Sequence, residues 1–200
     1  MNAKASSPKF LRPTTRRLVH CAAPVFAAAI ATTPVQAAFH LWNIREIYTD
    51  NSGSLQFIEL FCPASGQTFT MNQQIRVSNG TTTHTFTVPS NLGSDSLNHA
   101  WLFGTAGVHA AGAPTPDFII SDNFLFSGGG TISFFGANGG AYTALPTDGI
   151  LSRTWGDGNA PNTPQNFAGQ VGVVVPEPST WVMLATGGIG LGLALRRRLG

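Results

Sequence analysis

Two glutamates in apolar surroundings are the residues of this sequence best suited to chemistry. Glu46 lies in the strand-like run 39–48, and Glu59 lies in a second run, 55–61. The turn-forming residues 50–53 separate the runs, so we expect a β-hairpin that brings the two carboxylates together. Neighbouring carboxylates can serve general acid–base chemistry or glycoside hydrolysis. The same glutamates could instead cap loops, face solvent from a sheet edge or pair with an arginine, and we expect such a structural role. The arginines available for a pair are Arg45 and Arg76.

The remaining reactive side chains form no recognisable catalytic or metal-binding motif. The histidines lack the close spacing of a helical zinc site, and the Gly-x-Ser-x-Gly pattern of a serine nucleophile is absent. We expect Cys62 to be a buried thiol, with intermolecular pairing as the alternative. The loops 50–54 and 155–159 offer too few oxygen ligands for calcium, and turn chemistry explains both. We therefore predict a protein that is not an enzyme and holds no metal or cofactor. The histidines concerned are His40, His84, His99 and His109.

Trp155 is the residue that we select as a ligand platform. It stands beside Gly156 and Asp157 in an expected loop, where an exposed aromatic ring can stack on a sugar. The alternative is a tryptophan that covers one end of the domain. Trp101 lies in an apolar run, so we expect it in the core.

The charge balance changes when the two ends of the chain are set aside. The 200 residues together carry a formal charge of +2. Residues 38–175 contain eight acidic and three basic side chains and no lysine, which gives a net charge of −5. A mildly acidic domain should bind neither nucleic acid nor anionic lipid through its bulk charge.

The elements that must position these residues are expected to be short strands. No stretch between residues 39 and 175 shows a sustained helical period, and turn residues separate the apolar runs. A propeller would need internal repeats of about 40 residues, which are not present. We predict an all-β sandwich or barrel. Strands are expected over 39–48, 55–61, 74–77, 81–88, 100–103, 117–120, 123–126, 131–135 and 150–155, with a further strand at Tyr142.

The first 37 residues have the features of a secretory signal peptide. A basic region without acidic residues precedes the modestly apolar stretch 18–30. Small residues follow, so we expect signal peptidase to cleave after Ala37 or Ala38. Arg16 and Arg17 match a twin-arginine signal only in part, and we prefer the general secretory route. An organelle-targeting peptide is the alternative.

The C-terminal segment combines three consecutive features. Pro176, Glu177 and Pro178 form a stretch that breaks regular structure. The uncharged apolar run 181–195 would form a helix of about 22 Å at ~1.5 Å per residue, shorter than a hydrocarbon core of ~30 Å. Snorkelling arginines and local thinning of the bilayer can compensate for the difference. The basic residues that would stop translocation are Arg196, Arg197 and Arg198.

This tripartite tail resembles the PEP-CTERM sorting signal of exported bacterial proteins. The resemblance implies cleavage near Pro176 to Pro178 by an integral-membrane exosortase, usually in bacteria that make an exopolysaccharide matrix. The expected location is the inner membrane before processing, and then the cell surface or matrix of a Gram-negative-type bacterium. The predicted parts of the chain are a signal peptide (1–37), a β-sandwich domain (38–170), a linker with the motif (171–180), a transmembrane helix (181–195) and a basic cytoplasmic tail (196–200).

The middle of the chain carries a second resemblance. Residues 44–48 and 57–61 look like the Ile-x-Glu and Phe-Ile-Glu-Leu strands that open a lamin tail domain. Further similarities follow in order at 77–80 with 85–89, 100–103, 124–135 and 160–164. The resemblance implies an immunoglobulin-like β-sandwich used for adhesion or attachment, and it supplies no catalytic residue.

These observations favour an exported structural or adhesive protein of the cell surface or matrix. The alternatives are a carbohydrate- or exopolysaccharide-binding module and a hydrolase that uses Glu46 and Glu59. The expected partners are signal peptidase, an exosortase and the membrane through residues 181–195, without nucleic acid.

Overall fold

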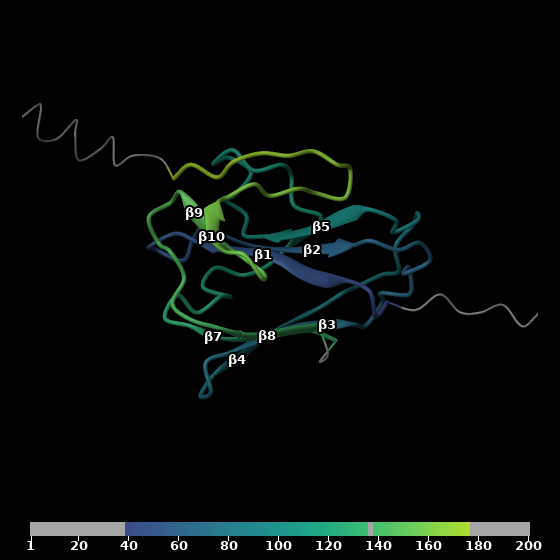
Figure 1. Cartoon of the computed structure of the whole chain (residues 1–200), viewed down its shortest axis with the longest axis horizontal. Coiled ribbons are helices and arrows are strands. Elements are labelled where there is room, and N and C mark those ends of the chain that lie inside the picture. Colours follow the sequence, from purple (N-terminus) through teal and green to yellow (C-terminus); the bar gives the residue numbers. More distant parts are fainter. Residues whose placement is uncertain (1–38, 136–137, 177–200) are drawn as a thin grey trace, which may run out of the picture. The chain divides into compact units, whose positions relative to one another are not determined.

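The computed structural model describes residues 39–135 and 138–176, which lie in one compact unit of the chain (Figure 1). The predicted signal peptide with Ala37 and Ala38 lies outside the described residues, as does the tail from Glu177 to Gly200. All regular elements in the described part are β-strands, which confirms the all-β prediction. In these residues, no helix is both long and apolar enough to pass through a bilayer.

Ten strands in the described ranges form two sheets. The six-stranded sheet has the order β10-β9-β1-β2-β5-β6, and the four-stranded sheet has the order β4-β3-β7-β8. The two sheets face each other as a sandwich, as Figure 1 shows. The strands are β1 (Asn43–Thr49), β2 (Gln56–Cys62), β3 (Gln74–Ser78), β4 (Thr83–Thr87), β5 (His99–Gly104), β6 (Phe118–Ile119), β7 (Gly130–Phe134), β8 (Asn138–Tyr142), β9 (Leu151–Thr154) and β10 (Gly158–Pro161).

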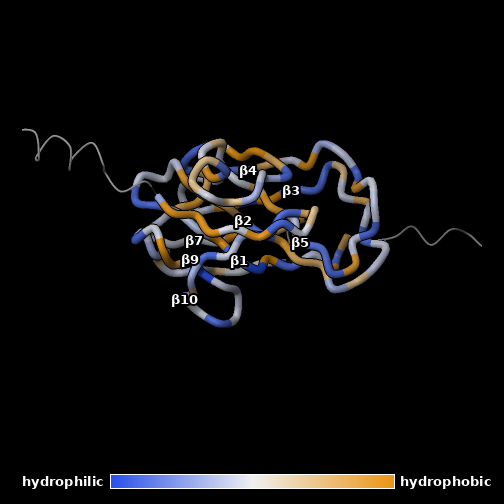
Figure 2. The backbone as a smooth tube through the Cα atoms, turned by 90° about the horizontal axis from the view of Figure 1, so that it is seen from above, coloured by the Kyte–Doolittle hydropathy of each residue, from blue (hydrophilic) through white to orange (hydrophobic). Residues whose placement is uncertain are grey.

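Alternating side chains fill the space between the two sheets. Because successive residues of a strand point to opposite faces, Ile58 and Leu60 of β2 face inward while Phe57 and Glu59 face outward. Trp101 of β5 is buried in the same inner core, as predicted. Hydrophobic segments run through the middle of the unit in Figure 2, and many hydrophilic ones lie in loops at its two ends.

The outer face of the six-stranded sheet is covered as well. Segments 105–117 and 162–176 run over it and form a third layer, along the upper side of Figure 1. A second, smaller core lies beneath this layer. Burial on both faces explains why β2 is apolar at consecutive positions and does not alternate with polar residues. The members of this outer core are Tyr48, Phe57, Leu102, Val108, Ala113 and Val174.

Two details differ from the predicted strand pattern. Residues 123–126 form no strand, because the buried side chain of Gln56 binds both backbone groups of Leu125 in place of a sheet neighbour. The distances are 2.9 Å from Leu125 N–H to Gln56 Oε1 and 3.0 Å from Gln56 Nε2 to the Leu125 carbonyl oxygen. Strand β10 was not expected, because its glycine, asparagine and proline are typical of turns. It lies at a sheet edge, the place where proline is tolerated.

Candidate functional site

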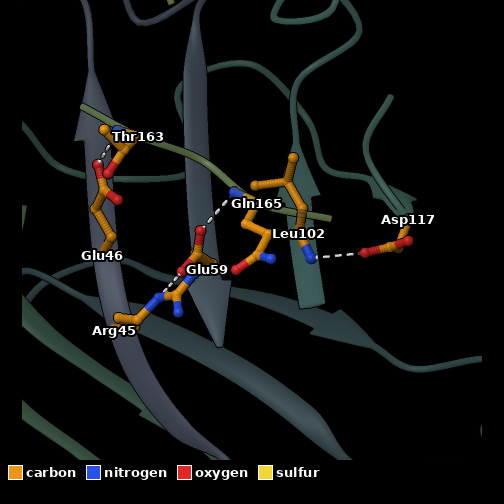
Figure 3. Close-up of polar contacts among 7 residues, drawn as sticks. All are labelled: Arg45, Glu46, Glu59, Leu102, Asp117, Thr163 and Gln165. Carbon is orange, nitrogen blue, oxygen red and sulfur yellow. Dashed lines mark hydrogen bonds and ion pairs between the residues drawn. The ribbon is translucent and has the colours of Figure 1, made fainter. Parts of the chain in front are cut away.

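Glu46 and Glu59 are direct neighbours across the predicted β1–β2 hairpin, which is confirmed. A bulge in β1 sets two residues, Arg45 and Glu46, opposite Glu59. Arg45 thereby reaches the outer face, where its Nε donates a hydrogen bond to Glu59 Oε1 in an ion pair (Figure 3). Of the structural roles considered for Glu59, pairing with Arg45 is therefore the one observed.

Both glutamates also accept backbone hydrogen bonds from the covering segment 162–176. Thr163 N–H donates to Glu46 Oε1 at 3.0 Å, and Gln165 N–H donates to Glu59 Oε2 at 2.6 Å (Figure 3). In an extended chain, residues two apart direct their N–H groups to the same side. The glutamate pair therefore holds the covering segment in the way that an adjacent strand would.

These contacts leave little of either carboxylate for a substrate. Glu46 and Glu59 are buried, and neither lines the surface pockets at Trp155 and at Asn72. Burial is the main influence on Glu59 and raises its pKa, while Arg45 and the Gln165 N–H act in the opposite direction. The arrangement is suited to clamping a polypeptide segment onto the sheet.

Asp117 is a third carboxylate in this clamp, and the sequence analysis did not single it out. Its Oδ2 accepts hydrogen bonds from Leu102 N–H at 2.8 Å and from Phe167 N–H at 2.9 Å. Figure 3 shows the bond to Leu102 at the edge of β5. Burial raises the pKa of Asp117 above its ordinary value of 3.8, and the two hydrogen bonds oppose this shift. A single aspartate before a short strand offers no motif that could have identified it.

Mild acidification should stabilise the domain through Asp117. Because folding raises the pKa of this carboxyl, the native state binds a proton more readily than the unfolded chain between 3.8 and the raised value. Its contribution to the free energy of unfolding should therefore increase as the pH falls from neutral through the raised pKa, and level off below 3.8. Urea unfolding of residues 39–176 at a series of pH values measures this effect.

Asp117→Asn is the matched variant for that measurement. The amide oxygen can still accept both N–H groups, but the side chain no longer titrates. The variant should lose this part of the pH dependence while the rest of the profile is retained. An identical pH profile in both proteins would show that Asp117 does not contribute.

Residues 171–176, which we name the strap, complete the covering layer. The Val174 side chain is fully buried in the outer core. The buried Asn162 binds its backbone twice, since Oδ1 accepts from Val174 N–H at 2.6 Å and Nδ2 donates to the Val174 carbonyl oxygen at 3.0 Å. An asparagine amide thus supplies both hydrogen bonds that a neighbouring strand would make.

The flanks of Val174 are attached too. Val175 N–H donates to the Ala111 carbonyl oxygen at 2.8 Å. The ring of Pro176 packs over Gly149, where an added side chain would collide with it. The sequence analysis assigned residues 171–180 to a linker. Residues 171–176 of this segment pack against the sandwich. On the N-terminal side of Val174, the strap pairs Val171 with Gln165 and Gly172 N–H with the Pro164 carbonyl oxygen.

Trp155 lines a surface pocket of about 360 Å³. The pocket lies between the edge strand β8 and the β9–β10 hairpin, and its volume falls within the ~300–1,000 Å³ common for ligand sites. The Trp155 ring is partly buried against the inner core and passes close to Gly140, which has no side chain to obstruct it.

Arg153 lines the same pocket without a carboxylate partner among the described residues. Its Nη2 donates to Thr143 Oγ1 at 2.8 Å, and its buried Nε has no hydrogen-bond partner there. A guanidinium group carries five donors, so most of its capacity is unused by the described part of the protein.

The histidines and Cys62 do not converge on one another. His84, His99 and His109 each direct Nδ1 to a backbone carbonyl oxygen, at 2.8–2.9 Å. Over residues 39–135 and 138–176, no group of three histidine, cysteine or acidic side chains is arranged to hold a metal ion. Cys62 is buried, as expected from its apolar context.

Comparison with known proteins concerns the end of the chain. A family model described as the PEP-CTERM protein-sorting motif matches residues 174–198. No curated protein and no solved structure matches the chain. The match begins at the buried Val174 of the strap. It covers the predicted sorting residues, which are Pro176, Glu177, Pro178, Arg196, Arg197 and Arg198. The molecule thus combines a two-sheet β-domain with a PEP-CTERM sorting motif, which marks proteins exported in Gram-negative bacteria and implies an exosortase as processing partner.

Proposed function

We propose that this protein is exported, retained briefly at the inner membrane by its tail, and delivered by an exosortase to the cell surface or extracellular matrix. The motif match over residues 174–198 is the observation that carries this proposal. Pro176 to Pro178 serve as the recognition element, residues 181–195 as the membrane element, and the three following arginines as the stop. Signal peptidase removes residues 1–37 during export.

In that location the domain acts as a structural or adhesive module without catalysis. The two facing sheets support an immunoglobulin-like sandwich of the lamin-tail type. A hydrolase that uses Glu46 and Glu59 is disfavoured, because both carboxylates are buried and bound by the covering segment. The same burial supports a role in which a stable domain is displayed.

The intact mass of the native protein in membrane and extracellular fractions tests the sorting proposal. A species that spans about residue 38 to the Pro176 region, found outside the cell, is the expected result. A membrane-bound species that retains Arg196 to Arg198 at steady state would mean a permanent C-terminal anchor and would overturn the proposal.

Carbohydrate binding at Trp155 is the second candidate function. The pocket combines an indole ring, which can stack on a sugar face, with the guanidinium of Arg153. Guanidinium groups bind carboxylates through two parallel hydrogen bonds, so a sugar acid fits this pair better than a neutral sugar. The observation that favours it is that Arg153 lines the pocket beside Trp155 and has no carboxylate partner among the described residues.

Trp155→Ala should lower the affinity of residues 39–176 for polygalacturonate by at least about tenfold, the cost of losing ~1.4 kcal/mol of stacking. Arg153→Met should produce a similar loss for polygalacturonate and little change for neutral dextran. Isothermal titration calorimetry measures both. Phe69→Ala, which removes a partly exposed aromatic ring outside the pocket, is the control. Equal binding by all three variants and the parent would reject the site.

A further inference from the structure

We infer that the processing enzyme recognises the sorting motif while the strap is docked on the sandwich, through a surface formed by the strap's outward side chains and Ile150. This inference rests on the proposed exosortase processing and specifies the surface that the enzyme contacts. Three features of the strap carry it.

The first feature is that the motif begins inside the folded domain. The matched segment starts at Val174, and the backbone of Val174 and Val175 is already hydrogen bonded to Asn162 and Ala111. A protease that bound this part of the chain by adding a strand to it would need those same backbone groups. An enzyme that recognises Val174 and Val175 must therefore either displace the strap or contact its exposed side chains.

The second feature is the absence of a spacer. Pro176 packs on Gly149, and the next residue, Glu177, belongs to the recognition element. Consecutive Cα atoms are about 3.8 Å apart, so any bond cleaved beside Glu177 lies within a few ångströms of the domain surface. From Pro176 to the start of the apolar run at Trp181 the chain can extend at most about 18 Å. A membrane enzyme that acts on this stretch must approach the folded domain closely.

The third feature is an apolar stripe on the outer side of the strap. Because alternate residues of the strap point outward, Val171, Val173 and Val175 are 64%, 49% and 59% exposed. Ile150, which is 64% exposed, lies near the C-terminal half of the strap, since Asn162 binds the carbonyl oxygens of both Ile150 and Val174. Adjacent exposed apolar side chains of this kind mark interaction surfaces. The short connection to the tail makes the membrane-embedded processing enzyme the partner that this stripe fits.

The test uses the full precursor in a host that contains the processing enzyme, with pulse-chase immunoblotting to follow conversion to the mature form. The double variant Ile150→Ser with Val173→Ser changes the stripe at positions that precede the matched motif. We expect processing to slow by at least about tenfold. Met71→Ser with Leu97→Ser, each 48% exposed and away from the strap, is the matched control and should be processed normally. Equal rates for both double variants would overturn the inference.

A spacer insertion tests the same inference without altering the sandwich. Eight glycine and serine residues placed between Val175 and Pro176 leave the hydrogen bonds of Val174 and Val175 to Asn162 and Ala111 in place. They release Pro176 from Gly149 and move the recognition element away from the stripe. Slower processing is expected, and unchanged or faster processing would mean that the enzyme needs only the tail. Glu177→Gln distinguishes a failure of this inference from a failure of the sorting proposal. If it blocks processing while the stripe and spacer variants are processed normally, the sorting proposal stands and this inference fails. If Glu177→Gln and a deletion of Arg196 to Arg198 are also processed normally, both fail.

Discussion

Replacing Glu177 with glutamine should leave the precursor in the membrane fraction with its C-terminal tail intact. Glu177 is the only acidic residue in the matched segment 174–198, so it is the only carboxylate that an enzyme could read there. Removing one partner of a desolvated charge pair costs about 2–5 kcal/mol, and every ~1.4 kcal/mol is a factor of ten. We therefore expect processing to slow by about 30-fold or more. Pulse-chase labelling followed by mass determination of both forms measures the rate.

Two companion variants define what this result means. Ser179→Ala changes a neighbouring polar residue without changing charge and should be processed at the parental rate. Deletion of Arg196 to Arg198 should also leave the precursor unprocessed, because it removes the positive charge that fixes the end of the apolar run. Normal maturation of both the Glu177 variant and the arginine deletion would contradict the sorting mechanism.

Glu59→Ala should destabilise the domain by about 1–3 kcal/mol, the usual cost of leaving a buried hydrogen-bonding group without its partner. The substitution leaves Arg45 without its carboxylate and Gln165 N–H without its acceptor. It also frees the covering segment at the point where the segment crosses the hairpin. Urea or guanidinium unfolding of residues 39–176 gives the change in the free energy of unfolding.

Two controls accompany the Glu59 experiment. Glu59→Gln retains an oxygen for Gln165 N–H but not the charge, so it should lose less stability than the alanine variant. Asp122→Ala removes an exposed carboxylate and should stay within about 0.5 kcal/mol of the parent. A loss below about 1 kcal/mol for Glu59→Ala would show that the clamp contributes little to folding.

The sequence was sufficient to predict the hairpin, because two apolar runs separated by the turn residues 50–53 are a local pattern. The sorting motif could also be predicted from the sequence, because its three parts follow one another in the chain and resemble a known signal. The covering layer could not be predicted in the same way. Asp117 and Asn162 act through backbone groups far away in the chain, and neither belongs to a local pattern. The strap resembled a linker in the sequence. A valine-rich run before prolines does not indicate that the Asn162 side chain will bind its backbone.

The position of the strap also gives the domain two unlike poles. The described chain begins at Phe39 and ends at Pro176, which lie at opposite ends of the folded unit in Figures 1 and 2. The loop that holds Gln67 lies at the Phe39 pole, where Gln67 accepts a hydrogen bond from Leu41 N–H. Exposed apolar side chains gather in the loops of that pole, at Leu41, Phe69, Met71 and Leu97. A domain tethered at Pro176 would turn this pole outward, so that neighbouring molecules beyond the membrane meet it before they meet the strap.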